Sequence, residues 1–140
     1  MKRKETRYIV IHCSATPSNM DIGAEDIDHW HKERGWSGIG YHEVIRRDGS
    51  LELGRGVNAV GAHVRGYNSL SVGVCLVGGV DASNTPTNNF TKAQFKTLVR
   101  SLKFYKALFP DALVVGHGEL NKGKACPSFD VQEFLAKEGF

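Results

Sequence analysis

Residues 8–12 read Tyr-Ile-Val-Ile-His, a β-branched and aromatic run that ends on a potential metal ligand. Such a run is typical of a buried strand, so we expect a strand at Tyr8–Ile11. Two similar runs follow later, Ser71–Val77, which ends at a pair of glycines, and the shorter Leu113–Val115. Helical patterns separate the three runs, and the sequence therefore predicts an α/β fold in which a central mixed β-sheet is flanked by helices.

The other elements are predicted from hydrophobic periodicity and from turn residues. Asp48-Gly49 is the strongest short hairpin signal in the chain, and Thr91 is a typical helix N-cap ahead of apolar residues at helical spacing. In chain order, the expected elements are a helix at Gly23–Arg34, a hairpin of Tyr41–Arg46 and Leu51–Leu53, a helix from Thr91 to Leu108, and a helix at Asp130–Lys137. Because no linker interrupts this order, residues 1–140 are predicted to form a single domain.

The composition excludes several classes of protein. The chain has 140 residues, of which 41% are hydrophobic and 24% charged, as in an ordinary globular domain. Its formal net charge of +3 is modest and its basic residues are dispersed, which argues against a nucleic-acid partner. The apolar runs are too short to span a bilayer or to form the core of a signal peptide. We expect a monomer that is made in the cytoplasm without an export signal and has no membrane partner.

Two histidines and one cysteine occupy positions typical of metal ligands. His12 follows the first strand, His117 follows the strand at Leu113–Val115, and Cys126 lies in the loop beyond. If those two strands are parallel neighbours, both imidazoles lie at the carboxyl edge of the sheet. Two imidazoles and one thiolate suit Zn²⁺ and leave a fourth position for water, as in catalytic sites. From spacing alone, it stays open whether these are structural histidines and a buried thiol.

Short sequence blocks in a characteristic order cover nearly the whole chain. The blocks are Ile11–Thr16, Trp30–Glu33, Gly35-Trp36, Gly40–His42, Arg47–Gly49, Gly66–Asn68, Ser71–Gly79 and Lys124–Asp130. In this order they resemble the type 2 N-acetylmuramoyl-L-alanine amidases, and are most similar to the short lysozyme-amidases of T-odd bacteriophages, which are related to animal peptidoglycan recognition proteins. The resemblance implies an amidase-like fold with zinc ligands at His12, His117 and Cys126. The loop from His117 to Lys124 is slightly longer than in the phage enzymes.

The resemblance also implies an activity. It is hydrolysis of the amide between the lactyl group of N-acetylmuramic acid and L-alanine in bacterial peptidoglycan. In that family the residues matching Tyr41 and Lys124 serve catalysis, and the stretch that contains His63 and Asn68 borders the substrate cleft. We therefore expect His63 and Asn68 to bind the muropeptide, although Gly-Tyr-Asn at Asn68 is also typical of a turn.

The positions of Tyr41 and Lys124 suit a catalytic role. The oxyanion that forms during amide hydrolysis requires a hydrogen-bond donor or a cation, and a phenol and an ammonium supply these. Tyr41 would lie beside His12 if its strand ran antiparallel to Tyr8–Ile11, and Lys124 shares its loop with a predicted zinc ligand. The alternative for Tyr41 is a packing residue, and the alternative for Lys124 is a solvated loop residue.

The remaining histidines, cysteines and one loop carboxylate are assigned other roles. His29 and His31 are interpreted as structural or surface residues, His42 as a hydrogen-bonding core residue, Cys13 and Cys75 as core thiols, and Glu119 as either a solvated residue or a carboxylate that orients a ligand imidazole. An odd, low number of cysteines argues against a secreted disulfide scaffold.

Two rival functions stay open at this stage. Some relatives bind peptidoglycan without cleaving it, and these typically lack the cysteine ligand; the presence of Cys126, Tyr41 and Lys124 favours catalysis. Some phage relatives also regulate a polymerase partner, a role that no feature of this sequence identifies. If the protein is an endolysin of a phage or prophage, it acts on the cell wall after release, with the help of a separate pore-forming protein.

Overall fold

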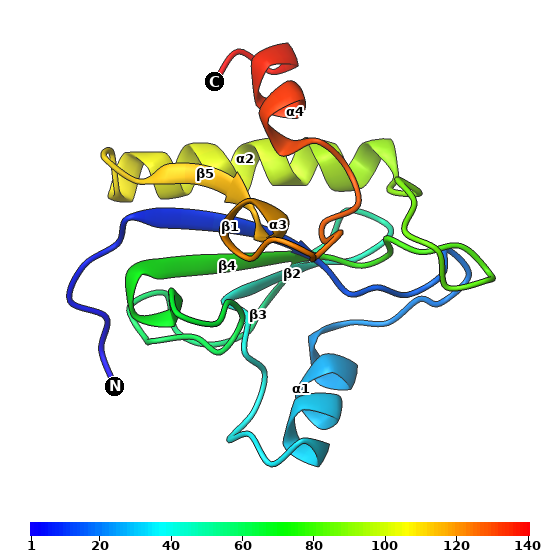
Figure 1. The fold of residues 1–140 in the computed structure, drawn as a ribbon, viewed down its shortest axis with the longest axis horizontal. Coiled ribbons are helices and arrows are strands. Elements are labelled where there is room, and N and C mark those ends of the chain that lie inside the picture. The colour runs from blue at the N-terminus through cyan, green and yellow to red at the C-terminus, as the bar shows by residue number, and fades with distance from the viewer.

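The computed structural model of the protein describes residues 1–140 and contains one five-stranded sheet (Figure 1). The strands are β1 (Tyr8–Cys13), β2 (Glu43–Ile45), β3 (Leu51–Leu53), β4 (Ser71–Leu76) and β5 (Leu113–Gly116). Their order across the sheet is β3-β2-β4-β1-β5. β2, β4, β1 and β5 are parallel and only β3 is antiparallel to its neighbour, so the sheet is mixed, as predicted.

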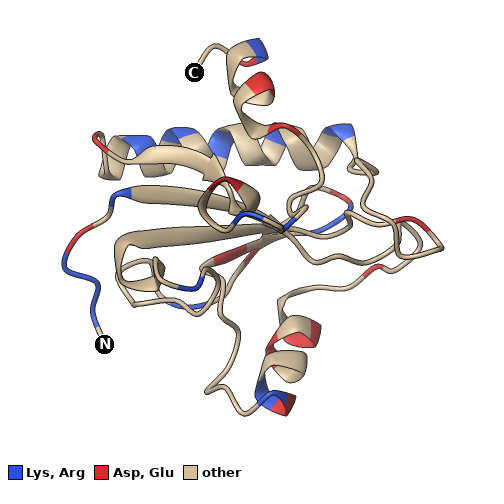
Figure 2. Cartoon of the chain, in the orientation of Figure 1, with Lys and Arg blue, Asp and Glu red and all other residues tan.

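Helices lie on both faces of this sheet. They are α1 (Ala24–Glu33), α2 (Lys92–Leu108), α3 (His117–Leu120) and α4 (Val131–Lys137), and a 3₁₀ turn spans Asn68–Leu70. Figure 1 shows α2 and α4 above the sheet and α1 below it. Lysine and arginine residues recur along α2 (Figure 2), whereas its buried residues Leu98, Leu102 and Tyr105 belong to the main core. No helix is both long and apolar enough to cross a membrane.

The alternation of side chains along β1 divides the interior into two parts. Ile9 and Ile11 point toward α2 and join the main core, whose buried members are Ile9, Ile11, Ile45, Val72, Val74, Leu76, Leu98, Leu102, Tyr105, Ala112, Val131 and Leu135. His12 alternates with Ile11 along the strand and therefore points to the other face, where the cleft described below opens. A smaller apolar cluster under α1 covers the rest of that face and includes Ile27, Val44 and Cys75.

The structure confirms the elements expected from the sequence and corrects two details. β1 extends to Cys13, so His12 lies inside the strand and not after it. The expected antiparallel arrangement of the Tyr41 strand and β1 is wrong. β2 begins only at Glu43, runs parallel to β4, and is separated from β1 by β4. The short helix α3 was not predicted, because four residues carry no readable helical period.

Gln94 connects the start of α2 to the ends of two strands. Thr91 is the N-cap, as predicted, and its hydroxyl accepts a hydrogen bond from the Gln94 backbone, while the Gln94 side chain accepts one from the Thr91 backbone. The fully buried Gln94 amide also donates to the carbonyl oxygens of Ile45 and Val77 at 3.1 and 2.9 Å. Helix position and strand position are therefore set by one side chain.

We expect Gln94→Ala to lower the free energy of unfolding by about 3 kcal/mol, because it leaves several buried backbone groups without partners. Urea denaturation followed by circular dichroism measures this difference. Lys96→Ala, an exposed substitution on the same helix, is the control and should change stability by less than about 0.5 kcal/mol. Equal stability of the two variants would contradict the role assigned to Gln94.

Candidate active site

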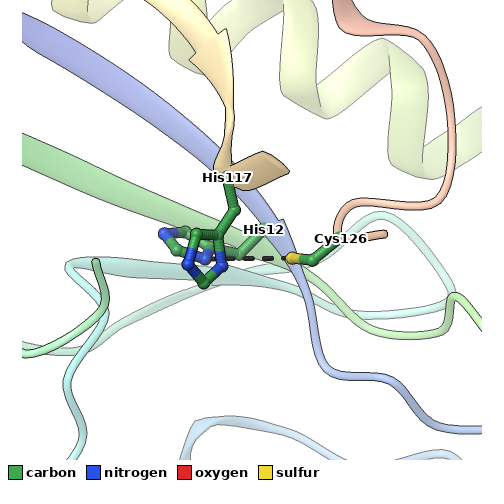
Figure 3. Close-up of side chains that lie close together, drawn as sticks. All are labelled: His12, His117 and Cys126. Carbon is green, nitrogen blue, oxygen red and sulfur yellow. Dashed lines mark hydrogen bonds between the residues drawn. The ribbon is translucent and has the colours of Figure 1, made fainter. Parts of the chain in front are cut away.

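Three side chains from separate segments converge below the carboxyl end of β1 (Figure 3). His12 comes from β1, His117 is the first residue of α3, directly after β5, and Cys126 lies in the loop that follows α3. One ligand atom from each lies within 4.8 Å of the other two, and Cys126 Sγ is 3.9 Å from His12 Nδ1. Because β1 and β5 are parallel neighbours, their carboxyl ends bring the two imidazoles together, as predicted. This cluster could hold a metal ion.

The loop that carries Cys126 is fixed by close backbone contacts. The backbone N–H of Gly118 donates to the Cys126 carbonyl oxygen at 3.0 Å, and a Cβ at position 118 would collide with the Lys124 carbonyl oxygen. The Cys126 sulfur accepts a hydrogen bond from the backbone N–H of Cys13 at 3.1 Å. Glycine at position 118 therefore lets the loop fold back so that the thiol faces β1.

Burial keeps the site histidines neutral. Burial, and then the nearby imidazoles of His63, His117 and His42, hold the pKa of His12 well below its ordinary value of 6.5. Burial and the Lys124 ammonium lower the pKa of His117. A metal binds only an unprotonated imidazole nitrogen, so these shifts favour metal binding at neutral pH.

We expect the metal-free protein to lose stability as the pH falls below about 6.5. Burial lowers the pKa of His42 to about 4 and that of His63 to about 3, whereas in the unfolded chain both titrate near 6.5. Between these values the unfolded state binds more protons, so their contribution is complete above pH 6.5 and is lost as the pH falls. Urea denaturation at pH 7 and pH 5 should differ by about 2 kcal/mol per histidine. An unchanged midpoint at pH 5 would contradict this.

A cleft of about 650 Å³ borders the ligand cluster at His117. Its lining residues are His31, Arg34, Trp36, Tyr41, Ala62, His63, Val64, Arg65, Asn68, His117, Asn121 and Lys124. The cleft therefore combines most of the residues that the sequence predicted with a ring of polar and basic groups. Arg34, Arg65 and Asn121 were not predicted from the sequence, since single polar loop residues carry no local signal. Trp36 fell within a recognised sequence block, but no role was assigned to it.

Tyr41 lies beside the ligand cluster, although it does so from a coil segment and not from the predicted antiparallel strand next to β1. Its ring centroid is 5.0 Å from that of His12, and the ring is half-buried. The segment before β2 approaches the His63 segment closely, because the Gly40 carbonyl accepts from the Ala62 N–H at 3.0 Å and a Cβ at Gly40 would collide with the Ala62 carbonyl. Burial, and then nearby thiols, raise the pKa of Tyr41 well above 10, so its hydroxyl remains a hydrogen-bond donor at neutral pH.

Lys124 also lines the cleft, and it is exposed. A tight turn holds its backbone, since the Lys124 N–H donates to the Asn121 carbonyl oxygen at 3.2 Å. The ammonium is close enough to His117 to lower the pKa of that imidazole. A cation thus borders the site from the loop after α3, while the phenol of Tyr41 borders it from the coil segment before β2.

His63 and Asn68 both line the cleft and both contact the protein itself. His63 is 8% exposed, and its Nδ1 is 2.8 Å from His12 Nε2. The Asn68 side-chain oxygen accepts hydrogen bonds from the backbone N–H groups of His63 and Val64 at 2.8 and 2.9 Å. The assignment of these two residues to substrate binding stays a prediction, because both of them also organise the site.

None of the residues assigned other roles belongs to the ligand cluster, and with one exception they do not line the cleft. His42 is buried and bonds the backbone of Gly73 and Ala59, as predicted for a core residue. All three cysteines are free thiols. Glu119 accepts from the Gly116 N–H at 2.6 Å and does not orient His117. The exception is His31, which is buried against Gly40 but also lines the cleft.

Two imidazoles and one thiol lie next to an open cleft that is also lined by a phenol and an ammonium. On an α/β sheet, this arrangement is typical of the class of metal-dependent hydrolases. The sequence profile of the N-acetylmuramoyl-L-alanine amidases matches residues 2–129. The chain belongs to this amidase family, as the resemblance implied.

Individual relatives agree with this assignment. An endolysin of Enterobacteria phage K11 is 52% identical over 134 residues, which cover 96% of this chain and 88% of that protein. The solved N-acetylmuramoyl-L-alanine amidase LysC from Clostridium intestinale has a TM-score of 0.83 at 30% identity, with 96% of this chain and 86% of that chain covered. A mutant of Drosophila PGRP-LB, solved in complex with tracheal cytotoxin, has a TM-score of 0.75 at 28% identity, with coverage of 91% and 78%.

Proposed function

We propose that the protein is a zinc-dependent endolysin that hydrolyses the amide bond between the lactyl group of N-acetylmuramic acid and L-alanine in bacterial peptidoglycan. The observation that carries the proposal is the cluster of His12, His117 and Cys126, of which His117 also lines the cleft. The similarity to phage endolysins over nearly the whole chain supports the biological role.

The donor set suits zinc better than other common metals. Two imidazoles and one thiolate are borderline and soft ligands, which zinc accepts in tetrahedral sites and which magnesium and calcium avoid. Zinc–nitrogen and zinc–sulfur bonds of about 2.0–2.3 Å place neighbouring ligand atoms about 3.5 Å apart. The 3.9 Å between His12 Nδ1 and Cys126 Sγ is close to that spacing. The fourth position of such a site would face the cleft.

The side chains around the cluster have defined tasks in this proposal. Zinc, when bound, supplies Lewis acidity toward water and the scissile carbonyl. Tyr41 donates a hydrogen bond to the carbonyl oxygen as that oxygen becomes negative, and its raised pKa keeps the donor protonated. Lys124 adds positive charge on the other side of the same oxygen. The cleft walls at Asn68 and Trp36 hold the glycan and the stem peptide.

Digestion of purified sacculi followed by mass spectrometry tests the proposal. An amidase releases stem peptides that begin with a free L-alanine amine and leaves glycan strands with intact lactyl groups. New reducing sugar ends would instead indicate a glycosidase. If the protein sediments with the sacculi but releases nothing, then it is a binding module and the proposed hydrolysis is wrong.

A further inference from the structure

The His63 imidazole is held in one orientation between two glycines. A Cβ at Gly61 would lie 2.6 Å from His63 Cδ2, and a Cβ at Gly73 would lie 2.6 Å from His63 Cγ, so a larger residue at either position would displace the ring. The two backbone hydrogen bonds accepted by Asn68 fix the loop that carries His63. The ring is thus confined by two close backbone segments and by its own backbone.

The hydrogen bonds of this ring form a chain whose direction is set at one end. Ser71 Oγ is 2.8 Å from the Tyr67 carbonyl oxygen, and two oxygens at this distance need a proton between them. A carbonyl can only accept, so the Ser71 hydroxyl donates its single proton there. Toward His63 Nε2, 3.3 Å away, Ser71 Oγ can then act only as an acceptor. His63 therefore carries its proton on Nε2.

The same constraint passes on to His12. A neutral imidazole carries one proton, so His63 Nδ1 is an acceptor once Nε2 is protonated. His12 Nε2 lies 2.8 Å from this atom and must supply the proton. His12 is then protonated on Nε2, and its lone pair is on Nδ1. That nitrogen is the one 3.9 Å from Cys126 Sγ, inside the ligand cluster.

We propose that His63 and Ser71 are positioning residues that hold His12 in the Nε2–H tautomer and aim the Nδ1 lone pair at the metal position. The proposal rests on the proposed zinc function of the cluster. Partners of this kind raise metal affinity by about 10- to 100-fold where a ligating histidine is oriented by a second group. The three hydrogen-bonded residues have little contact with water, since His12, His63 and Ser71 are 1%, 8% and 0% exposed.

Substitution at position 63 separates this role from a general structural one. In His63→Leu, no acceptor faces His12 Nε2. In His63→Asn, the side-chain oxygen stands near the former Nδ1 position and can still accept from His12. We expect His63→Leu to bind zinc about 10- to 100-fold more weakly than the unmodified protein, and His63→Asn to recover most of this loss. Competition with a chromophoric chelator at pH 7 measures both affinities.

NMR of the ¹⁵N-labelled, metal-free protein reads the tautomer directly from the imidazole nitrogen shifts. Long-range ¹H–¹⁵N correlations should show His12 protonated at Nε2 in the unmodified chain and a mixture of tautomers in His63→Leu. Ser71→Ala should shift the same equilibrium without altering the ring of His63, and Ser101→Ala, a buried serine outside this chain of bonds, should leave it unchanged. This readout needs neither zinc nor peptidoglycan, so it is independent of whether the amidase assignment holds.

Two results would overturn the proposal. One is a proton on His12 Nδ1 in the unmodified metal-free protein. The other is a folded His63→Leu variant that binds zinc as tightly as the unmodified protein. If His63→Leu fails to fold, Ser71→Ala decides the question. An unchanged His12 tautomer after loss of the Ser71 hydroxyl would show that these hydrogen bonds do not control His12.

Discussion

Cys126→Ser is expected to remove both bound zinc and amide hydrolysis. The unmodified protein should hold about one zinc per chain, because the structure contains one cluster of metal-ligating side chains. Serine replaces a thiolate by a neutral hydroxyl, which is a poor zinc ligand at pH 7, so only the two imidazoles would remain. Elemental analysis after dialysis should give less than about a tenth of an equivalent of zinc, and sacculus hydrolysis should fall to background.

Cys75→Ala is the matched control for this substitution. Cys75 is a fully buried thiol in the apolar cluster under α1 and belongs to no ligand set. This variant should lose some stability but keep its zinc at 25 °C; zinc content is the quantity compared, because the Cys75 thiol also contacts Tyr41. Full zinc occupancy in Cys126→Ser, or zinc loss in Cys75→Ala, would contradict the assignment of the three ligands.

Most of the fold could be predicted from local sequence signals. The β-branched run at Tyr8–Ile11, the Asp48-Gly49 turn and the Thr91 cap each encode their own conformation, and all three form as expected. The ligand pair His12 and His117 was also accessible, because residues near the carboxyl ends of neighbouring parallel strands converge whatever the intervening loops do.

The position of Tyr41 could not be derived in this way. Which strand lies next to which is decided by packing between distant segments, and β4 inserts between β2 and β1. The phenol reaches His12 from a coil segment that is held against Ala62 by Gly40, a contact with no local sequence pattern. The residue was identified through the family resemblance and not through the strand geometry.

The contacts of His63 show a second limit of the sequence. A buried histidine in a Gly-Ala-His segment gives no indication of its partners, because hydrogen bonds across 51 residues depend on the complete fold. The family resemblance predicts that His63 borders the substrate cleft, and His63 lines the cleft described above. Its bond to His12 adds a role that only the three-dimensional arrangement reveals.

Tyr41→Phe and Lys124→Ala are expected to slow hydrolysis by about 10²–10³ in kcat while zinc and substrate binding persist. Neither residue is in the ligand cluster, and both line the cleft beside it. Each group is proposed to stabilise negative charge that develops only in the transition state, so its loss should change turnover and leave ground-state affinity nearly constant. Elemental analysis, sacculus sedimentation and initial rates on soluble muropeptides measure the three quantities separately.

Different results for the two variants would contradict the roles assigned to Tyr41 and Lys124. Tyr41 is half-buried against the ligand histidine, so zinc loss in Tyr41→Phe would make it a supporting residue of the metal site. Lys124 is exposed on its loop, and a normal rate in Lys124→Ala would place its ammonium in solvent during the reaction. Lys122→Ala, on the same loop but outside the cleft lining, is the control and should cleave at the normal rate. A slow Lys124→Ala beside a normal Lys122→Ala would then assign the charge to one position in the cleft, because both substitutions remove the same net charge from the protein.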